Sequence, residues 1–389
     1  MEFKKRDTFL PYGRQSIDND DVKIVSRVMR GDFLTTGPTI NAFEEKLCDY
    51  TGAKYAVAVS NGTAALHCAM FAAGVGRGDE IITTSMTFAA TSNAALYLGA
   101  KPVFVDIYKD TYNIDVSKIE ERISKNTKAI VPVHFTGQPC EIDEIYELAS
   151  KYNLKVIEDG AHAFGARYKG KKLGIKSDFM TLSFHPVKHI TTGEGGAILT
   201  NDVKAYEKMK LFRSHGITRD TDMLENDDSP WYYEQHALGY NYRMTDIQAA
   251  LGISQVDKLD KFLKVRRELS EYYNKLFEDN KYVVKPYQLD YVESSWHLYV
   301  LKLEFEKLTC TRREFFEQMR ELNLGVNVHY IPVYYHPYYK KLGFSKGLCK
   351  NAENLYENMI TLPLHQNMKK EDVEYVVSCV DYLIDKYKK

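Results

Sequence analysis

The 389-residue sequence lacks the features that mark membrane proteins, secreted disulfide-rich proteins and nucleic-acid binders. It contains no run of 18 apolar residues, and the N-terminal stretch "MEFKKRDTFLPYG" has no apolar core of a signal peptide. Its six cysteines form no CxxC pair, which predicts reduced and mostly structural thiols. A net charge of -1 gives no overall attraction to nucleic acid or to an anionic membrane. We therefore expect a cytoplasmic protein that binds neither.

The first 250 residues combine short apolar strands with helical segments. The length predicts two domains rather than one core. Because strands and helices alternate, we expect an α/β domain with a large, mostly parallel sheet of seven strands. Strands that are apolar throughout are typical of a sheet covered on both faces. The expected strands are 55–60, 80–85, 101–107, 128–135, 155–159, 179–185 and 195–200.

The pattern changes after about residue 250. The sequence predicts one long helix over 253–277, a strand over 295–305, a helix over 311–323 capped by Thr311, and a closing helix over 370–387. We therefore divide the chain into a large α/β domain, 1–250, and a smaller α+β domain, 251–389. The first 15 or so residues could pack with the small domain instead.

Open α/β sheets bind ligands at the carboxyl ends of their strands, so the residues that follow each strand are informative. Asn61, Gly62 and Thr63 follow the first strand and begin a helix, an arrangement that can bind an anion. Taken alone, an ordinary strand-to-helix turn is the more frequent explanation. Phe88 follows the second strand, where its ring could cover a flat ligand or simply belong to the core.

Two further strand ends carry titratable groups. Asp159 ends a buried strand, where its carboxylate needs a partner, and His162 follows three residues later. The alternatives are a helix cap for Asp159 and a core position for His162. Lys188 follows another strand, and Pro186 argues against a helix there. A lysine at this place can serve as an amine nucleophile, although most lysines are simply solvated.

The order of these residues along the chain is more specific than any one of them. A phosphate-type turn, an aromatic ring, an aspartate and then a lysine together suit pyridoxal 5'-phosphate (PLP). Its phosphate prefers a helix N-terminus, its pyridine nitrogen a carboxylate, and its aldehyde a lysine. We therefore predict PLP as the cofactor.

Two other motifs are set aside. "GARYKGKK" (165–172) imitates a phosphate-binding loop, but Lys172 stands where Ser or Thr is needed, and the segment predicts a β-hairpin. His185 and His189 have the spacing of zinc ligands on a helix, but Pro186 disrupts such a helix. We expect no metal site.

The same segments resemble the DegT-type sugar aminotransferases, which are PLP enzymes of the aspartate aminotransferase fold. The resemblance covers nearly the whole chain and, within the family, is closest to the aminotransferases of pseudaminic acid synthesis. It rests on "FLTTGPTINAFEEKL", "SNGTAALHCAM", "DEIITTSMTFAATSNA", "KPVFVDI", "IEDGAHAFGA", "SFHPVKHITTGEGGAILTND", "LFRSHG", "GYNYRMTDIQAALG" and "VHYIPVYYHPYY".

The resemblance implies a role for each matching residue. Lys188 would form the Schiff base, Asp159 would face the pyridine nitrogen, and His162 would lie near the PLP 3-oxygen. Phe88 would stack on the ring, and Asn61, Gly62, Thr63 and Ser183 would surround the phosphate. Asn241 would reach the phosphate of the neighbouring subunit, which implies a homodimer with shared sites. The substrate cleft would be formed by Tyr12, Phe33, Leu34, Thr35, His329, Tyr330 and Ile331. The resemblance gives no function for His189.

The implied reaction moves an amino group, from glutamate as the expected donor, to C4 of a UDP-linked 4-keto-6-deoxy-N-acetylhexosamine. Two alternatives stay open. One is a different keto substrate, of the bacillosamine, aminoarabinose, perosamine or cyclitol type. The other is a PLP-binding sensor or regulator, which would retain the same residues without turnover.

Overall fold

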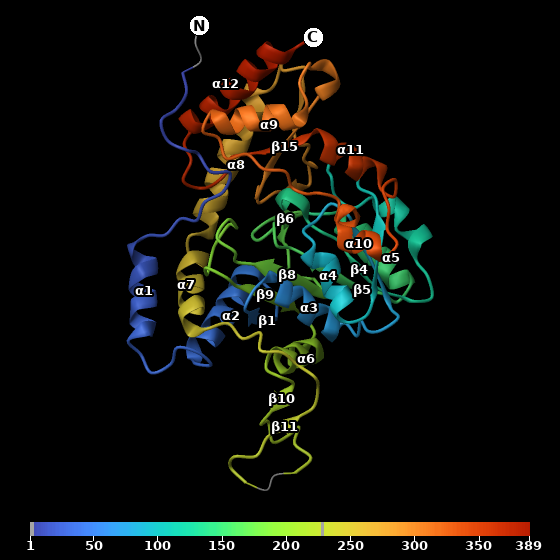
Figure 1. Cartoon of the computed structure of the whole chain (residues 1–389). Coiled ribbons are helices and arrows are strands. Elements are labelled where there is room, and N and C mark those ends of the chain that lie inside the picture. The colour runs from blue at the N-terminus through green and yellow to red at the C-terminus, as the bar shows by residue number, and fades with distance from the viewer. Residues whose placement is uncertain (1–3, 227–228) are drawn as a thin grey trace.

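The computed structural model describes residues 4–226 and 229–389, and its centre is a seven-stranded sheet (Figure 1). The strand order is β1-β9-β8-β5-β4-β2-β3. Only β9 runs antiparallel to its two neighbours, and the other pairings are parallel. This confirms the predicted large, mostly parallel sheet. Its strands are β1 (Tyr55–Val59), β2 (Glu80–Thr84), β3 (Lys101–Val105), β4 (Thr127–Val131), β5 (Lys155–Asp159), β8 (Phe179–Ser183) and β9 (Gly196–Thr200).

Helices cover both faces of this sheet because alternate side chains of each strand point to opposite sides. Val57 and Val59 of β1 pack into the core under α3, α4 and α6, whereas Ala56 and Ala58 pack into the core under α2, α7 and α8. A further core lies under α5. These helices are α2 (Pro38–Thr51), α3 (Gly62–Ala72), α4 (Ala90–Tyr97), α5 (Ile142–Lys151) and α6 (Val203–Arg213), with α7 and α8 given below.

The expected long helix over 253–277 is wrong: the structure has two helices, α7 (Asp246–Val256) and α8 (Leu259–Leu276). At the break, the Lys258 N–H donates to the Gln255 carbonyl at 3.1 Å, a bond of three residues rather than four. The Lys258 ammonium is held by Asp18 and Asp21, at 2.5 and 2.9 Å, beside α1 (Asn19–Met29). Hydrophobic periodicity continues through the break, so the sequence pattern does not reveal it.

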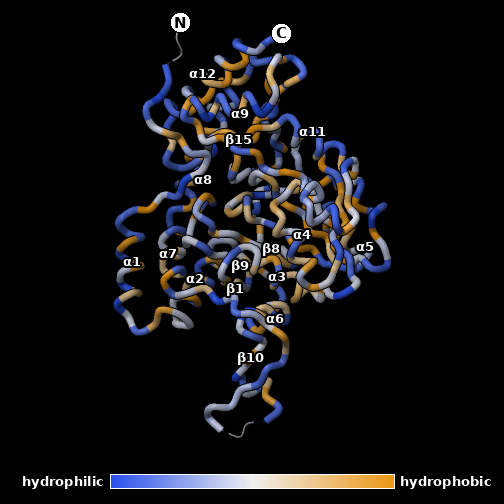
Figure 2. The backbone as a smooth tube through the Cα atoms, viewed as in Figure 1, coloured by the Kyte–Doolittle hydropathy of each residue, from blue (hydrophilic) through white to orange (hydrophobic). Residues whose placement is uncertain are grey.

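The C-terminal part has its own antiparallel sheet, in the order β12-β14-β15, packed on α8, α9 and α12. Thr311 caps α9, as predicted, by accepting from the Glu314 N–H at 3.2 Å. Figure 2 shows hydrophobic and hydrophilic stretches alternating along α12, whose apolar side chains are buried. Leu10 also packs into this core, while the division of the chain at residue 250 stays a prediction. The elements are β12 (Val283–Val284), β14 (Tyr299–Leu303), α9 (Arg312–Glu321), α10 (Pro337–Lys341), α11 (Lys350–Asn358), β15 (Met359–Leu362) and α12 (Lys370–Tyr387).

Two small hairpins complete the fold. The segment that imitates a phosphate-binding loop forms β6 (Arg167–Tyr168) and β7 (Lys171–Lys172), paired with β13 (Val292–Glu293), which confirms the predicted hairpin. The second hairpin, β10 (Ile217–Thr218) and β11 (Glu234–Gln235), projects away from the body of the protein (Figure 1). Within residues 4–226 and 229–389, no helix is long and apolar enough to cross a membrane.

Candidate active site

The carboxyl ends of β1, β2, β5 and β8 surround a cavity of about 890 Å³. Most of the predicted site residues line it although they come from distant parts of the sequence. The predicted residues that line the cavity are Tyr12, Asn61, Gly62, Thr63, Phe88, Asp159, His162, Ser183, Lys188, His329 and Tyr330. The cavity thus brings together the Lys188 amine, the Asp159 carboxylate and a helix N-terminus, and Glu194 also lines it.

The helix N-terminus belongs to α3, which starts at Gly62. Asn61 caps the helix by accepting from the Ala64 N–H at 2.8 Å. The first N–H groups of a helix have no partner within the helix, so they can bind an anion. A Cβ atom on Gly62 would lie 3.0 Å from Cβ of Ser183, which explains why glycine is needed for this close approach. The start of α3 and the Ser183 hydroxyl therefore form one polar corner of the cavity.

The carboxylate is that of Asp159, the last residue of β5, which is 5% exposed. The Thr91 hydroxyl donates to its Oδ2 at 2.7 Å, and the Ala161 N–H donates to its Oδ1 at 3.1 Å. Both donors point at the carboxylate oxygens and hold the side chain in place at the edge of the cavity. A buried carboxylate in this position is a suitable partner for a protonated ring nitrogen.

The amine is that of Lys188, in the loop that follows β8. Burial lowers its pKa to about 8, the Asp159 carboxylate acts in the opposite direction, and the Arg266 guanidinium lowers it further. An amine with this pKa is largely neutral at mildly alkaline pH, which a solvated lysine is not. A neutral amine is nucleophilic, so the environment of Lys188 suits a lysine that attacks a carbonyl group.

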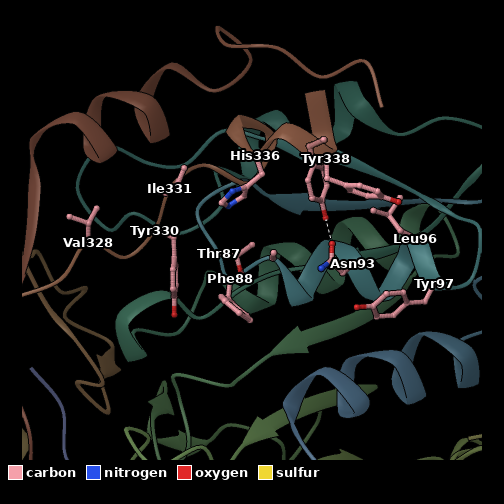
Figure 3. Close-up of a pocket in the computed structure, with 12 residues that line it drawn as sticks. Thr87, Phe88, Asn93, Leu96, Tyr97, Val328, Tyr330, Ile331, His336 and Tyr338 are labelled. Atoms are coloured by element: carbon pink, nitrogen blue, oxygen red, sulfur yellow. Dashed lines mark hydrogen bonds between the residues drawn. The ribbon is translucent and has the colours of Figure 1, made fainter. Parts of the chain in front are cut away.

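Histidine and aromatic side chains form the rest of the wall. Nε2 of His162 is 2.9 Å from the Tyr330 hydroxyl, and burial lowers the pKa of His162 well below its usual value. Phe88 is 63% exposed and lies between Tyr330 and Tyr97 in the view of Figure 3. These two tyrosines and Phe88 also line an adjoining pocket of about 600 Å³, which is where the structure places Ile331.

Besides Ile331, four predicted residues do not line the cavity of their own chain. Asn241 is exposed and pairs through its backbone with Ser214. Phe33, Leu34 and Thr35 are also exposed, and Thr35 pairs with Thr245, four residues after Asn241. The structure thus leaves all four residues exposed and outside the cavity of their own chain, and their roles stay predictions.

Sequence reasoning missed two residues that contact the proposed site. Thr91 bonds Asp159 and is visible in the sequence only as one more polar residue of the motif "MTFAATSNA". His297 lies with Nε2 3.4 Å from Nζ of Lys188, yet it belongs to a segment that was predicted as a plain strand. No local pattern indicates that this segment turns back toward Lys188.

Comparisons with known proteins show the family of the chain. The sequence profile described as the DegT/DnrJ/EryC1/StrS aminotransferase family matches residues 15–381, so the chain belongs to this family and is an aminotransferase. It is 42% identical, over 98% of its length and 99% of the relative, to the UDP-4-amino-4,6-dideoxy-N-acetyl-beta-L-altrosamine transaminase of Campylobacter jejuni.

Solved structures show the same relationship. PseC of Helicobacter pylori, described as an aminotransferase of pseudoaminic acid biosynthesis, matches with a TM-score of 0.90 and 34% identity, covering 97% of this chain and 100% of PseC. The sugar aminotransferase Spr1654 of Streptococcus pneumoniae, in its PLP form, matches with a TM-score of 0.90 and 30% identity, over 97% and 99% of the two chains. The predicted PLP-enzyme fold is therefore confirmed.

Proposed function

We propose that this chain is a PLP-dependent aminotransferase that acts on a nucleotide-linked keto sugar. The proposed acceptor is a UDP-linked 4-keto-6-deoxy-L-N-acetylhexosamine, which receives its amino group at C4 from L-glutamate. The product would be UDP-4-amino-4,6-dideoxy-N-acetyl-β-L-altrosamine. The observation that carries the proposal is the single cavity containing the Lys188 amine, the Asp159 carboxylate and the N-terminus of α3. The similarity to the Campylobacter jejuni transaminase supports the choice of sugar.

The chemistry of the cavity residues fits PLP. The N-terminus of α3 and the Ser183 hydroxyl suit a phosphate, and the Asp159 carboxylate, held in place by its two donors, suits the pyridine nitrogen. The Lys188 amine, with its lowered pKa, suits the aldehyde. Phe88 at the mouth and His162 on the wall would contact the ring of the cofactor.

When bound, PLP supplies an electron sink for the carbon that loses or gains the amino group. Asp159 preserves that property by keeping the ring nitrogen protonated. Lys188, once its amine is free, takes a proton from Cα of the amino donor and, in the second half of the reaction, delivers a proton to C4 of the sugar. The overall exchange balances, because glutamate and keto sugar become 2-oxoglutarate and amino sugar.

Tyr12, His329, Tyr330 and Ile331 are proposed to line the substrate side of the cavity. The rings of Tyr12 and His329 lie 5.3 Å apart, and Ile331 lies in the adjoining pocket (Figure 3). This pocket would give the sugar nucleotide room beyond the cofactor. Burial lowers the pKa of His329 to about 3, so its imidazole is neutral. Its Nδ1 lies 3.0 Å from the Thr361 hydroxyl and its Nε2 lies 3.4 Å from the Asn327 amide nitrogen, and these two contacts orient the ring.

A homodimer with shared sites is part of the proposal. Asn241 and the run Phe33, Leu34 and Thr35 lie outside the cavity of their own chain, and all four are exposed on the surface. Phe33 and Leu34 are 56% and 49% exposed, which favours a protein contact at this surface. A partner subunit facing this surface would receive Asn241 at the phosphate end of its own cavity.

Two measurements test the proposed function. Borohydride reduction of the enzyme with PLP, followed by peptide mapping, is expected to label Lys188, and label on another lysine would refute the assignment. Turnover with glutamate is then measured on UDP-, dTDP- and GDP-linked 4-keto sugars. Preference for another sugar would replace the proposed substrate. Labelling of Lys188 without any turnover would support the sensor or regulator alternative.

A further inference from the structure

One imidazole lies directly against the Lys188 amine. Nε2 of His297 is 3.4 Å from Nζ of Lys188, and His297 is only 4% exposed. The centroid of the His297 ring is also 4.3 Å from that of His162. His297 thus contacts two of the predicted cofactor residues, Lys188 and His162, from a distant segment of the chain.

The loop that carries His297 is strained and firmly held. Trp296, the residue before it, has a φ of 50°, in the left-handed region that large side chains rarely adopt. The Ser294 hydroxyl accepts from the Trp296 N–H at 3.1 Å, and the Ser295 hydroxyl donates to the His162 carbonyl at 2.7 Å. Backbone strain of this kind persists only where surrounding contacts maintain it, and it is concentrated at functional sites.

Arg266, on α8, also holds the loop that carries His297. This fully buried guanidinium donates to the Trp296 and His297 carbonyls at 3.2 Å each, and to the Leu364 carbonyl at 3.0 Å. It also donates to the side-chain oxygen of Gln366 at 3.0 Å, so all four of these acceptors are neutral. The main chain of His297 is therefore fixed between α8 and the segment that follows β15.

The charges around His297 keep it neutral. Burial lowers its pKa well below the usual value, and the facing groups Lys188, His162, His189 and Arg266 lower it further. The carboxylate of Asp159 acts on Lys188, whose pKa it raises. A neutral imidazole has one ring nitrogen that accepts a hydrogen bond, and Lys188 is the donor closest to Nε2.

We propose that His297 is a positioning residue, whose neutral imidazole accepts a hydrogen bond from the free amine of Lys188 and holds that amine toward the cavity. This inference rests on the proposed function, because it concerns the state in which Lys188 is not attached to the cofactor. The strained loop and the Arg266 clamp serve to place the imidazole. No proton needs to leave or enter His297 in this role.

The test compares His297→Leu, His297→Gln and a matched control, His365→Leu. His365 is also a buried histidine, 3% exposed, and its Nδ1 accepts from the Asn367 N–H rather than from Lys188. In the full-length chain without cofactor, the pKa of each lysine is measured from the pH dependence of its labelling by an amine-reactive reagent. Mass spectrometry of the peptides separates Lys188 from exposed lysines such as Lys23, which serve as internal references.

Removing the acceptor leaves the buried ammonium without this partner, so the pKa of Lys188 is expected to fall by about one unit in His297→Leu. The amide oxygen of His297→Gln can accept a hydrogen bond, so the pKa of Lys188 in this variant should stay close to the wild-type value. The control His365→Leu should leave the pKa of Lys188 unchanged. In the PLP-loaded enzyme, His297→Leu should lower kcat about tenfold while KM for the donor stays the same.

An unchanged pKa of Lys188 in a folded His297→Leu protein would overturn the proposal, as would an equal shift in the control. If the leucine variant does not fold, His297→Asn takes its place, because its shorter amide does not reach Lys188. The labelling needs no cofactor and no turnover. Borohydride label on a lysine other than Lys188 would therefore refute the proposed function, whereas the titration decides the role of His297 separately.

Discussion

Asn241 provides the sharpest test of how two subunits share a site. Its side chain is exposed and does not line the cavity formed by its own chain, whereas Lys188 does. If the two residues act in the same site, they come from different subunits. Two variants that are each inactive, Lys188→Ala and Asn241→Asp, should then rescue one another when they are mixed.

The expected loss of cofactor affinity follows from charge repulsion, and the expected recovery of activity in the mixture follows from the symmetry of a dimer. Asn241→Asp would place a carboxylate beside the cofactor phosphate, and two like charges 4 Å apart near a protein surface repel by about 4 kcal/mol. A repulsion energy of this size corresponds to about a thousandfold loss of cofactor affinity. After random exchange of an equal mixture, about half of the dimers are mixed, and each has one intact site, so about a quarter of wild-type activity should return.

The assay measures transamination of the mixture over time, with native mass spectrometry to follow the exchange of subunits. Each variant alone, incubated in the same way, is the control. If mixed dimers form and activity does not return, Lys188 and Asn241 belong to one chain's site, and the shared-site proposal fails.

The remaining predictions concern the cavity of a single chain. Asp159→Asn should keep the fold, checked by thermal unfolding, and lower kcat by about 10- to 1000-fold, because the ring-nitrogen pKa loses about 1–3 units of support. Near wild-type turnover would disprove the role of Asp159. The rate of PLP attachment to the cofactor-free enzyme should rise with pH and level off near pH 8, the pKa of Lys188, not near 10.5. At pH 7, about 9% of such an amine is neutral, against about 0.03% of an ordinary lysine, and a rate that still rises steeply above pH 9 would contradict the lowered pKa.

Much of this fold was predictable because its signals are local. The seven strands of the large sheet are short apolar runs with turn residues between them, and each appears within a few residues of its predicted place. That Gly62, Asp159 and Lys188 meet in one cavity was also predictable, since Asp159 ends a strand, Gly62 and Lys188 each follow one, and strands of a parallel sheet end at one edge.

The features that the sequence did not predict depend on contacts between distant segments. His297 is 109 residues away from Lys188 along the chain, and only the path of the C-terminal part brings it there. The break between α7 and α8 coincides with ion pairs from Lys258 to Asp18 and Asp21, near the other end of the chain. Neither feature leaves a repeating pattern in the sequence, because periodicity records which face of an element is buried and not what it contacts.

The buried guanidinium of Arg266 also has a consequence for how the protein opens. Its acceptors come from the loop before β14 and from residues 364 and 366, so neither segment can separate from α8 without leaving buried donors unpaired, at about 1–3 kcal/mol each. The two segments therefore belong to one cooperative unfolding unit with α8. Residues 364–366 do not line the cavity, yet a deletion of the C-terminal chain that removed them would loosen the wall that faces Lys188.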